Sequence, residues 1–355
     1  MKKNIVLIGP TPPPIGGVSI HVKRFSLLLK ELGIPCRTIS TTSSESSDGV
    51  IAVGGNLVLG LLRSLPQVRG AIVVVHSSEL YGTFVALLCK IFGGQVVQYF
   101  HNGRAIKRFE PRVLLGSLWG WALRRLDGVF VVNSDIRRDI NVLSMTTSLV
   151  QKVNPYLPPH PSELRLGPLS ESFCSSRIYI GWCGIATGDR AEIYGFGFFL
   201  DLLIALVSSR PNVVGVIGVG GRVVRDSLSD EVKAKFDSIS SRLVFVPESV
   251  AFAAVMTKLH VFVRSTSSDG DAVSVREALS LGAHVLASNV VERPDGVVLY
   301  RFGDVDDGLS KLIGLVGKPR PVCDSKYSAE SISFHQAEAP GSIDEVRSLI
   351  EFVQS

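Results

Sequence analysis

The sequence predicts an α/β protein of two doubly wound, Rossmann-like domains. Short apolar runs of strand type alternate with helical segments, and 46% of the 355 residues are hydrophobic, as in parallel sheets whose strands are buried on both faces. This alternation begins at residue 3 and starts again at residue 178. The Pro-rich stretch Val153–Pro161 separates the two halves. We therefore expect one domain over 1–161 and a second over 162–341.

The first domain opens with a strand, a stiff turn and a helix. Lys3–Gly9 is a buried strand, Pro10–Gly17 is rich in proline and ends in two glycines, and Val18–Leu32 has helical spacing. Strand, glycine-rich turn and helix open a doubly wound sheet. Gly16 and Gly17 would let backbone approach a ligand closely, although a plain tight turn explains them equally well. The turn is not GxGxxG, so a dinucleotide site is poorly supported.

The rest of the first half continues the alternation. A helix is expected after Ser134, whose hydroxyl would cap it. The other predicted helices are 57–65 and 81–92, and the predicted strands are 35–40, 71–76, 95–101 and 128–133.

Histidines stand at the ends of two of these strands. His76 closes the 71–76 strand and His101 closes the 95–101 strand. Ligands of open α/β sheets bind beyond the carboxyl ends of the strands, which raises both residues above an ordinary core histidine. His21, within the first helix, is expected to lie on the helix surface.

The segment Arg104–Arg125 combines basic residues with Trp119 and Trp121 and has Glu110 as its one acid. Basic side chains beside Trp, Leu and Phe are typical of a helix that lies in a membrane interface. A packed helix with a solvated basic face explains the same residues. Both interpretations stay open at this point.

The second half repeats the pattern. Gly220 follows the second of its strands in Gly218-Val-Gly-Gly221, a weak nucleotide signal without a third glycine at the right spacing. A terminal amphipathic helix at 342–355 is expected to pack back on the first domain. The predicted strands are 178–183, 213–218, 243–246, 261–263, 284–287 and 297–302, and the predicted helices are 196–208, 230–239, 251–258 and 306–315.

The stretch 261–289 carries the strongest functional signal. A strand is followed by a polar loop, a helix that stops at Gly282, and a second strand. Asp269 and Glu277 stand eight positions apart around the start of the helix. Backbone N–H groups at a helix N-terminus bind phosphate, and carboxylates accept hydrogen bonds from sugar hydroxyls. The pattern suggests a nucleotide-sugar site. Its candidate donor contacts are Arg264, Gly270, Asp271, Ala272, Val273, Ser274 and Arg276.

Composition limits the classes of partner that the protein is expected to bind. Residues 1–160 hold 18 Lys+Arg and 8 Asp+Glu, a net charge of +10, and the remainder has a net charge of −5. No nucleic-acid motif is present, so we expect an anionic membrane surface or a diphosphate substrate. Five cysteines without a CxxC pair predict reduced thiols in a cytoplasmic protein. We expect neither a signal peptide nor a transmembrane helix.

The segment from Asp269 through Glu277, Ala278 and Leu279 to Gly282 resembles the E-x7-E motif of family-4 retaining glycosyltransferases. Asp269 stands at the first glutamate, one methylene shorter, and Glu277 at the second. The resemblance spans most of the chain and implies the GT-B arrangement, with two Rossmann-like domains that face each other across a cleft. It also implies that Glu277 binds the ribose, that Asp269 and His101 lie at the transferred sugar, and that Gly16, Gly17 and Gly220 approach the donor.

The chain departs from this family early in the second domain. The family carries Arg and Lys there, as G-R-x-x-x-x-K-G, to bind the donor diphosphate. Here Tyr194 stands where the Lys would precede Gly195. Arg190, in the longer stretch before it, is the candidate that would supply a charge.

The resemblance implies a metal-independent, retaining hexosyl transfer from a nucleoside-diphosphate sugar to an acceptor hydroxyl. We expect no cofactor and no metal, because Asp269 and Asp271 alone make a thin cage for a cation. The basic first domain suggests an acceptor at the inner face of the membrane, such as a lipid-linked saccharide in bacterial surface-polysaccharide assembly. The alternative is a catalytically silent, glycosyltransferase-like binding or scaffold protein. An oxidoreductase or epimerase reading lacks its GxGxxG fingerprint.

Overall fold

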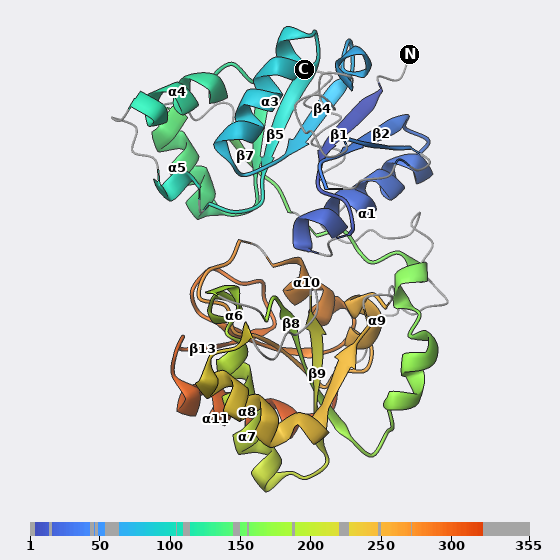
Figure 1. The fold of residues 1–355 in the computed structure, drawn as a ribbon, viewed down its shortest axis with the longest axis vertical. Coiled ribbons are helices and arrows are strands. Elements are labelled where there is room, and N and C mark those ends of the chain that lie inside the picture. Colours follow the sequence, from blue (N-terminus) through green and yellow to red (C-terminus); the bar gives the residue numbers. More distant parts are fainter. Residues whose placement is uncertain are drawn as a thin grey trace. The chain divides into compact units, whose positions relative to one another are not determined.

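A computed structural model shows two compact α/β units, which meet in the sequence between Leu157 and Pro158. In each, helices cover the two faces of a parallel sheet (Figure 1). The helices predicted at 57–65, for the most part, and at 342–355 lie outside the described residues. The structure describes residues 4–13, 16–42, 46, 49–53, 64–103, 105–108, 114–144, 150–154, 156–186, 189–219, 227–247, 250–270 and 272–321.

The first unit holds a seven-stranded parallel sheet with the strand order β3-β2-β1-β4-β5-β6-β7. The strands β1 and β4 consist mostly of aliphatic residues and are buried at every position. This burial on both faces explains why apolar runs in the sequence predicted them. The strands are β1 Ile5–Gly9, β2 Cys36–Ser40, β3 Val50–Ala52, β4 Ile72–His76, β5 Gln95–Phe100, β6 Gly128–Val131 and β7 Val150–Lys152.

Four α-helices of the described residues connect these strands. The helix α1 covers Gly17–Glu31 and contacts β1 and β2, and α3, Leu80–Ile91, contacts β4 and β5. The helices α4, Leu114–Leu123, and α5, Ser134–Ser144, lie side by side at one margin of the unit (Figure 1). Short 3₁₀ turns occur at Leu65–Gln67 and Ile106–Arg108.

The second unit holds a six-stranded parallel sheet with the order β10-β9-β8-β11-β12-β13. Two 3₁₀ turns, Pro161–Leu164 and Gly167–Ser172, precede it, and a third covers Ser240–Arg242. The strands are β8 Ile178–Gly184, β9 Val213–Val219, β10 Leu243–Val246, β11 Val261–Arg264, β12 His284–Ser288 and β13 Val297–Tyr300. The helices are α6 Asp189–Tyr194, α7 Phe196–Ser209, α8 Asp230–Ile239, α9 Phe252–Met256, α10 Val273–Ser280 and α11 Val305–Val316.

Two apolar clusters lie on the two faces of the second sheet. Trp182 and Val263 pack with α7 and α11 in one cluster, and Phe262 packs with α9 and α10 in the other. Neighbouring residues of β11 therefore point into opposite clusters, as the two-residue period of a strand requires. The prediction of two doubly wound, Rossmann-like domains is confirmed.

Strand order places a topological switch point in each sheet. In the first sheet the order reverses between β1 and β4, and in the second it reverses between β8 and β11. Loops diverge at such a point, and ligands of open α/β sheets bind there, beyond the carboxyl ends of the strands. His76 ends β4, and Arg264 ends β11.

Some local predictions were wrong. The edge strands β3 and β7 were missed, because each has only three residues and neither is buried along its whole length. Asn133, not Ser134, caps α5, since its Oδ1 accepts from the Ile136 N–H at 2.8 Å. His21 is 1% exposed, so it lies in the core and not on the helix surface.

Candidate functional site

Asp269 is the centre of a buried ion cluster after β11. Its Oδ2 accepts from Arg264 Nε at 2.9 Å, Arg293 Nη1 at 3.0 Å and Thr266 Oγ1 at 3.2 Å. Its Oδ1 accepts from Arg264 Nη2 at 3.1 Å and the Gly270 N–H at 3.1 Å. A carboxylate has about four lone-pair positions. The five hydrogen bonds therefore use the whole acceptor capacity of Asp269.

The charges of this cluster stabilise one another. Burial alone would raise the pKa of Asp269, but Arg264 and then Arg293 more than offset it and lower this pKa to about 2. Burial opposes the charge of Arg264, and Asp269 reverses that effect and raises the pKa of the guanidinium. The side chains of Arg264 and Asp269 are 11% and 10% exposed, and that of Arg293 is 2% exposed. Arg264 and Asp269 are therefore both charged at neutral pH.

The helix α10 begins three residues after Gly270. Its N-cap residue, Ala272, makes no side-chain capping bond, so the first N–H groups, at Val273 and Ser274, are suited to an anion. Glu277 is 8% exposed on this helix. It lies close enough to Cys183 to contribute to that thiol's pKa, which burial first of all raises to about 11. Arg264 Nη1 donates to the Cys183 carbonyl at 3.4 Å, so Glu277 and Arg264 both lie close to Cys183.

Tyr194, the last residue of α6, lies against Arg264. The guanidinium of Arg264 lies 5.3 Å from the centre of the Tyr194 ring, as in a cation–π contact. The Tyr194 carbonyl accepts from Trp182 Nε1 at 3.1 Å and from Ser265 Oγ at 3.0 Å. Gly195 follows with a φ of +66°, and a Cβ there would collide with the Ser265 carbonyl. Tyr194, which stands where the resemblance leads us to expect a lysine, thus packs against an arginine from β11.

The first unit brings three histidines together at its own switch point. His76 Nδ1 lies 3.1 Å from His101 Nε2, and the His21 ring lies 4.9 Å from that of His101. Tyr99 stacks on His101, with ring centres 4.3 Å apart and planes 7° apart. Burial, and then the nearby His21, lower the pKa of His76 and of His101 well below the usual range. These two imidazoles are therefore neutral at pH 7.

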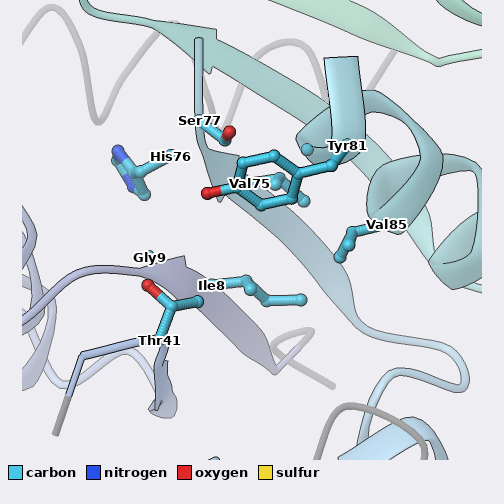
Figure 2. A pocket seen from close by; sticks show the side chains of 9 residues that line it. Ile8, Gly9, Thr41, Val75, His76, Ser77, Tyr81 and Val85 are labelled. Atoms are coloured by element: carbon cyan, nitrogen blue, oxygen red, sulfur yellow. The ribbon is translucent and has the colours of Figure 1, made fainter. Parts of the chain in front are cut away.

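An apolar hollow opens beside His76. Figure 2 shows the ring of Tyr81 extending across it, with the His76 side chain at one side. The walls come from the ends of β1 and β4, from α3 and from the residue after β2, and they are formed by Ile8, Gly9, Thr41, Val75, His76, Ser77, Tyr81, Gly82 and Val85.

The glycine loop of the first unit leads into α1. The Gly16 N–H donates to Ser19 Oγ at 2.9 Å, and Gly17 is the first residue of the helix. A Cβ at Gly17 would meet no atom of the described residues within 4 Å. The fold around Gly17 therefore does not require a glycine, which leaves close approach by a ligand as a reason for it.

Some predicted site residues lie outside the described part of the chain. These are Gly220, Asp271 and the side chain of Arg190, although the backbone of Arg190 belongs to α6. Arg276 lies in α10, one residue before Glu277.

Sequence reasoning missed two residues of these sites. Arg293 lies between the predicted strands 284–287 and 297–302, and no local pattern links it to Asp269, 24 positions away. His21 could have been found, because it shares one helical face with Phe25, Leu28 and Leu29, which are all buried.

Comparisons with known proteins show the fold of the chain. No family model matches the sequence, and no curated protein matches it significantly. Among solved structures, Anabaena HepE in complex with UDP-glucose is similar, with a TM-score of 0.63 at 11% identity over 88% of this chain and 90% of that chain. Sucrose-phosphate synthase from Thermosynechococcus elongatus has a TM-score of 0.63 at 14% identity over 89% and 90%.

A third similar structure belongs to another class of enzyme. The putative UDP-N-acetylglucosamine 2-epimerase from Listeria monocytogenes has a TM-score of 0.56 at 15% identity over 89% of this chain and 88% of that chain. Proteins of more than one activity therefore share this two-unit α/β fold.

Proposed function

We propose that the protein is a glycosyltransferase that moves a hexosyl group from a nucleoside-diphosphate sugar to an acceptor hydroxyl. The observation that carries this proposal is the site at the switch point of the second sheet, where the uncapped start of α10, the charged Arg264 and the buried Glu277 come together. A helix N-terminus beside an arginine binds a diphosphate. The similar structures of HepE in complex with UDP-glucose and of sucrose-phosphate synthase have the same fold.

Stabilisation of the leaving diphosphate is assigned to this chain's own groups. The N–H groups at Val273 and Ser274 and the guanidinium of Arg264 would meet the negative charge that develops on the diphosphate as the glycosidic bond breaks. We assign to Arg264 the diphosphate-binding role of the missing lysine, because Arg264 stacks on Tyr194, which stands at the lysine's position. This arrangement supports transfer without a metal on the diphosphate, and Glu277 would hold the ribose hydroxyls.

Asp269 has a different role from the one that the resemblance implies. Its acceptor capacity is filled by Arg264, Arg293, Thr266 and Gly270, so no lone pair is left for a sugar hydroxyl. We therefore assign Asp269 to fixing the orientation of Arg264. Gly270 and Ala272 join this carboxylate to α10 and so tie the helix start to the arginine.

His101 is assigned to the transferred sugar. Its neutral imidazole can exchange hydrogen bonds with a hydroxyl without placing a charge beside the reacting carbon. Gly16 and Gly17 lie in the loop after β1, at the switch point of the same sheet. Retention of the anomeric configuration is part of the proposal, because the E-x7-E register is the motif of retaining enzymes.

A membrane-bound acceptor is supported by α4. Leu114, Leu115, Leu118 and Trp121 are 74%, 52%, 44% and 43% exposed and lie at helical spacing on one face. Arg125 covers the Trp121 ring at 5.2 Å. Trp119, by contrast, is fully buried and donates to Thr83 Oγ1 at 2.7 Å, so it belongs to the core.

An exposed apolar stripe beside basic residues fits the interface of an anionic membrane. We propose that α4 docks the protein there and that the acceptor is a lipid-linked saccharide of surface-polysaccharide synthesis. None of the described helices is long and apolar enough to cross a bilayer.

A silent, glycosyltransferase-like binding protein is the second candidate. It is favoured by Tyr194 in place of a lysine and by the full occupation of Asp269. Such a protein would bind a nucleotide sugar and leave it intact.

Donor turnover separates the two functions. UDP-, GDP- and ADP-sugars are incubated with the full chain, and the released nucleoside diphosphate and the configuration of the freed sugar are followed by NMR. The enzyme releases nucleotide from one donor with net retention, and Arg264→Gln slows this release by roughly 100-fold. Binding of a nucleotide without release from any donor would support the silent protein.

A further inference from the structure

Three imidazoles of the first unit converge at one point. The proposed function uses one of them, His101, and gives no role to the other two. His21 comes from α1, His76 from the end of β4, and His101 from the residue after β5. Each offers a ring nitrogen, and these three atoms lie within 4.8 Å of one another. His21 and His76 are 1% and 3% exposed, whereas His101 is partly exposed. The cluster therefore has two buried members and one that reaches toward solvent.

A ring nitrogen of His76 lacks a hydrogen-bond partner among the described residues. His76 Nδ1 shares a hydrogen bond with His101 Nε2, but His76 Nε2 is buried and has no hydrogen-bond partner among the described residues. Leaving a buried polar group unsatisfied costs about 1–3 kcal/mol. Whichever of the two rings donates, His76 keeps one ring nitrogen without a use. A ligand that binds this nitrogen would remove the cost.

The chemistry of the cluster is that of a transition-metal site. Imidazole nitrogen is the commonest protein ligand of metal ions, and the three rings each offer one such nitrogen to the same small space. In a tetrahedral zinc site with bonds of about 2.0–2.1 Å, the ligand nitrogens are about 3.4 Å apart. The spacing of the three nitrogens needs only small side-chain movements to reach that value.

We propose that His21, His76 and His101 bind a divalent transition-metal ion of the zinc class. Three imidazoles leave a fourth coordination position for water or an anion. This site is distinct from Asp269 and Asp271, where the sequence led us to expect no cation. It does not depend on the glycosyltransferase proposal, but it has a consequence for it. A bound ion occupies His101, so it competes with the contact between His101 and the sugar and inhibits transfer.

The competing account is that the three rings are only core. Tyr99 stacks on His101, and His76 lies nearly parallel to Tyr99, at 22°. Aromatic packing of this kind stabilises a cluster without any ion. It gives no reason for three different elements to aim imidazoles at one point, and it leaves His76 Nε2 unsatisfied.

Metal titration decides between these accounts. The full chain is freed of metal with a chelator, and Zn²⁺ binding is measured by competition with a chromophoric chelator. Co²⁺ serves as a second probe, because its visible absorption reports four-coordinate nitrogen ligation. We expect one ion per chain with each metal. His101→Asn, at the partly exposed position, should abolish this binding, and His284→Asn, in the second unit, should leave it unchanged.

The outcomes are distinct. Binding of one Zn²⁺ per chain that is lost in His101→Asn and kept in His284→Asn supports the site. Absence of stoichiometric binding overturns it, and so does binding that His101→Asn leaves intact. Circular dichroism of both variants verifies that they are folded. Because the readout is metal binding, failure of this site is distinguishable from failure of the donor site in the second unit.

Discussion

The role of Asp269 follows from the number of groups that its carboxylate binds. A carboxylate between two buried arginines cannot be removed cheaply, because its loss leaves Arg264 and Arg293 without the counter-ion that offsets their burial. Its stabilising effect must depend on pH, because protonation removes the same charge that a substitution removes.

We predict that Asp269 makes the second unit sensitive to acid. Its pKa of about 2 in the folded protein lies below the ordinary value of 3.8, so the ion cluster contributes about 2 kcal/mol above pH 4. This contribution is lost as the pH falls from 4 toward 2. Urea unfolding of the wild type and of Asp269→Asn should show a steeper fall in the free energy of unfolding for the wild type over this range.

The matched control is Asp201→Asn. Asp201 pairs with Lys235 near the surface, where the partners are 29% and 24% exposed, and such pairs contribute at most about 1 kcal/mol. At pH 7, Asp269→Asn should lose about 3–5 kcal/mol of stability and Asp201→Asn much less. Equal losses of stability at the two positions would contradict the conclusion that the buried ion cluster of Asp269 contributes more than a surface ion pair.

At the scale of elements, the join between β8, α6 and α7 fixes Tyr194 beside Arg264. Gly195 makes this join possible because its φ is +66° and because the Ser265 carbonyl lies where a Cβ would be. Backbone strain and steric overlap therefore act together at this single position.

We predict that Gly195→Ala destabilises the second unit by at least about 2 kcal/mol. Gly303→Ala is the control, because Gly303 also has a positive φ, +82°, but a Cβ there would meet nothing within 4 Å in the described residues. The control should lose about 1 kcal/mol. Thermal unfolding of both variants measures the difference, and equal losses would show that the approach of Ser265 does not matter.

The apolar stripe on α4 gives the second prediction at this scale. In co-sedimentation with vesicles that contain anionic lipid, the double variant Leu115→Ser, Trp121→Ser should bind less than the wild type, because it removes apolar area from the exposed face. Ile313→Ser, which changes a 40% exposed side chain of α11 in the second unit, should bind as the wild type does. No binding at low salt by the wild type would exclude the membrane proposal.

At the scale of the whole molecule, the buried strands were the part that sequence could predict. Their apolar runs are short, continuous and bounded by turns, and β10 and the helix α8 match their predicted bounds. The three-residue edge strands β3 and β7 could not be predicted in this way, because pairing with one neighbour, and not a buried sequence pattern, creates them.

The residues of the candidate sites also fall into those that the sequence could predict and those that it could not. The start of α10 and the position of Glu277 follow from local spacing, so sequence predicted them. Strand ends also predicted that His76 and His101 lie at one edge of a sheet. The burial of His21 follows from the helical face that it shares with Phe25, Leu28 and Leu29. The contact of Arg293 with Asp269, by contrast, depends on packing between segments that are distant in sequence. Such contacts have no local signature.

Nucleotide binding tests the account most directly. The unfolding temperature is measured with UDP, GDP, ADP and their common sugars for the wild type, for Glu277→Ala, and for Glu231→Ala, which changes an exposed carboxylate of α8 in the same unit. We predict that one nucleotide stabilises the wild type and Glu231→Ala, by about 2.7 kcal/mol at 100 times its Kd, and that Glu277→Ala shows no such shift. A chain that no nucleotide stabilises, or a Glu277→Ala variant that keeps the shift, would contradict a nucleotide-sugar site at α10.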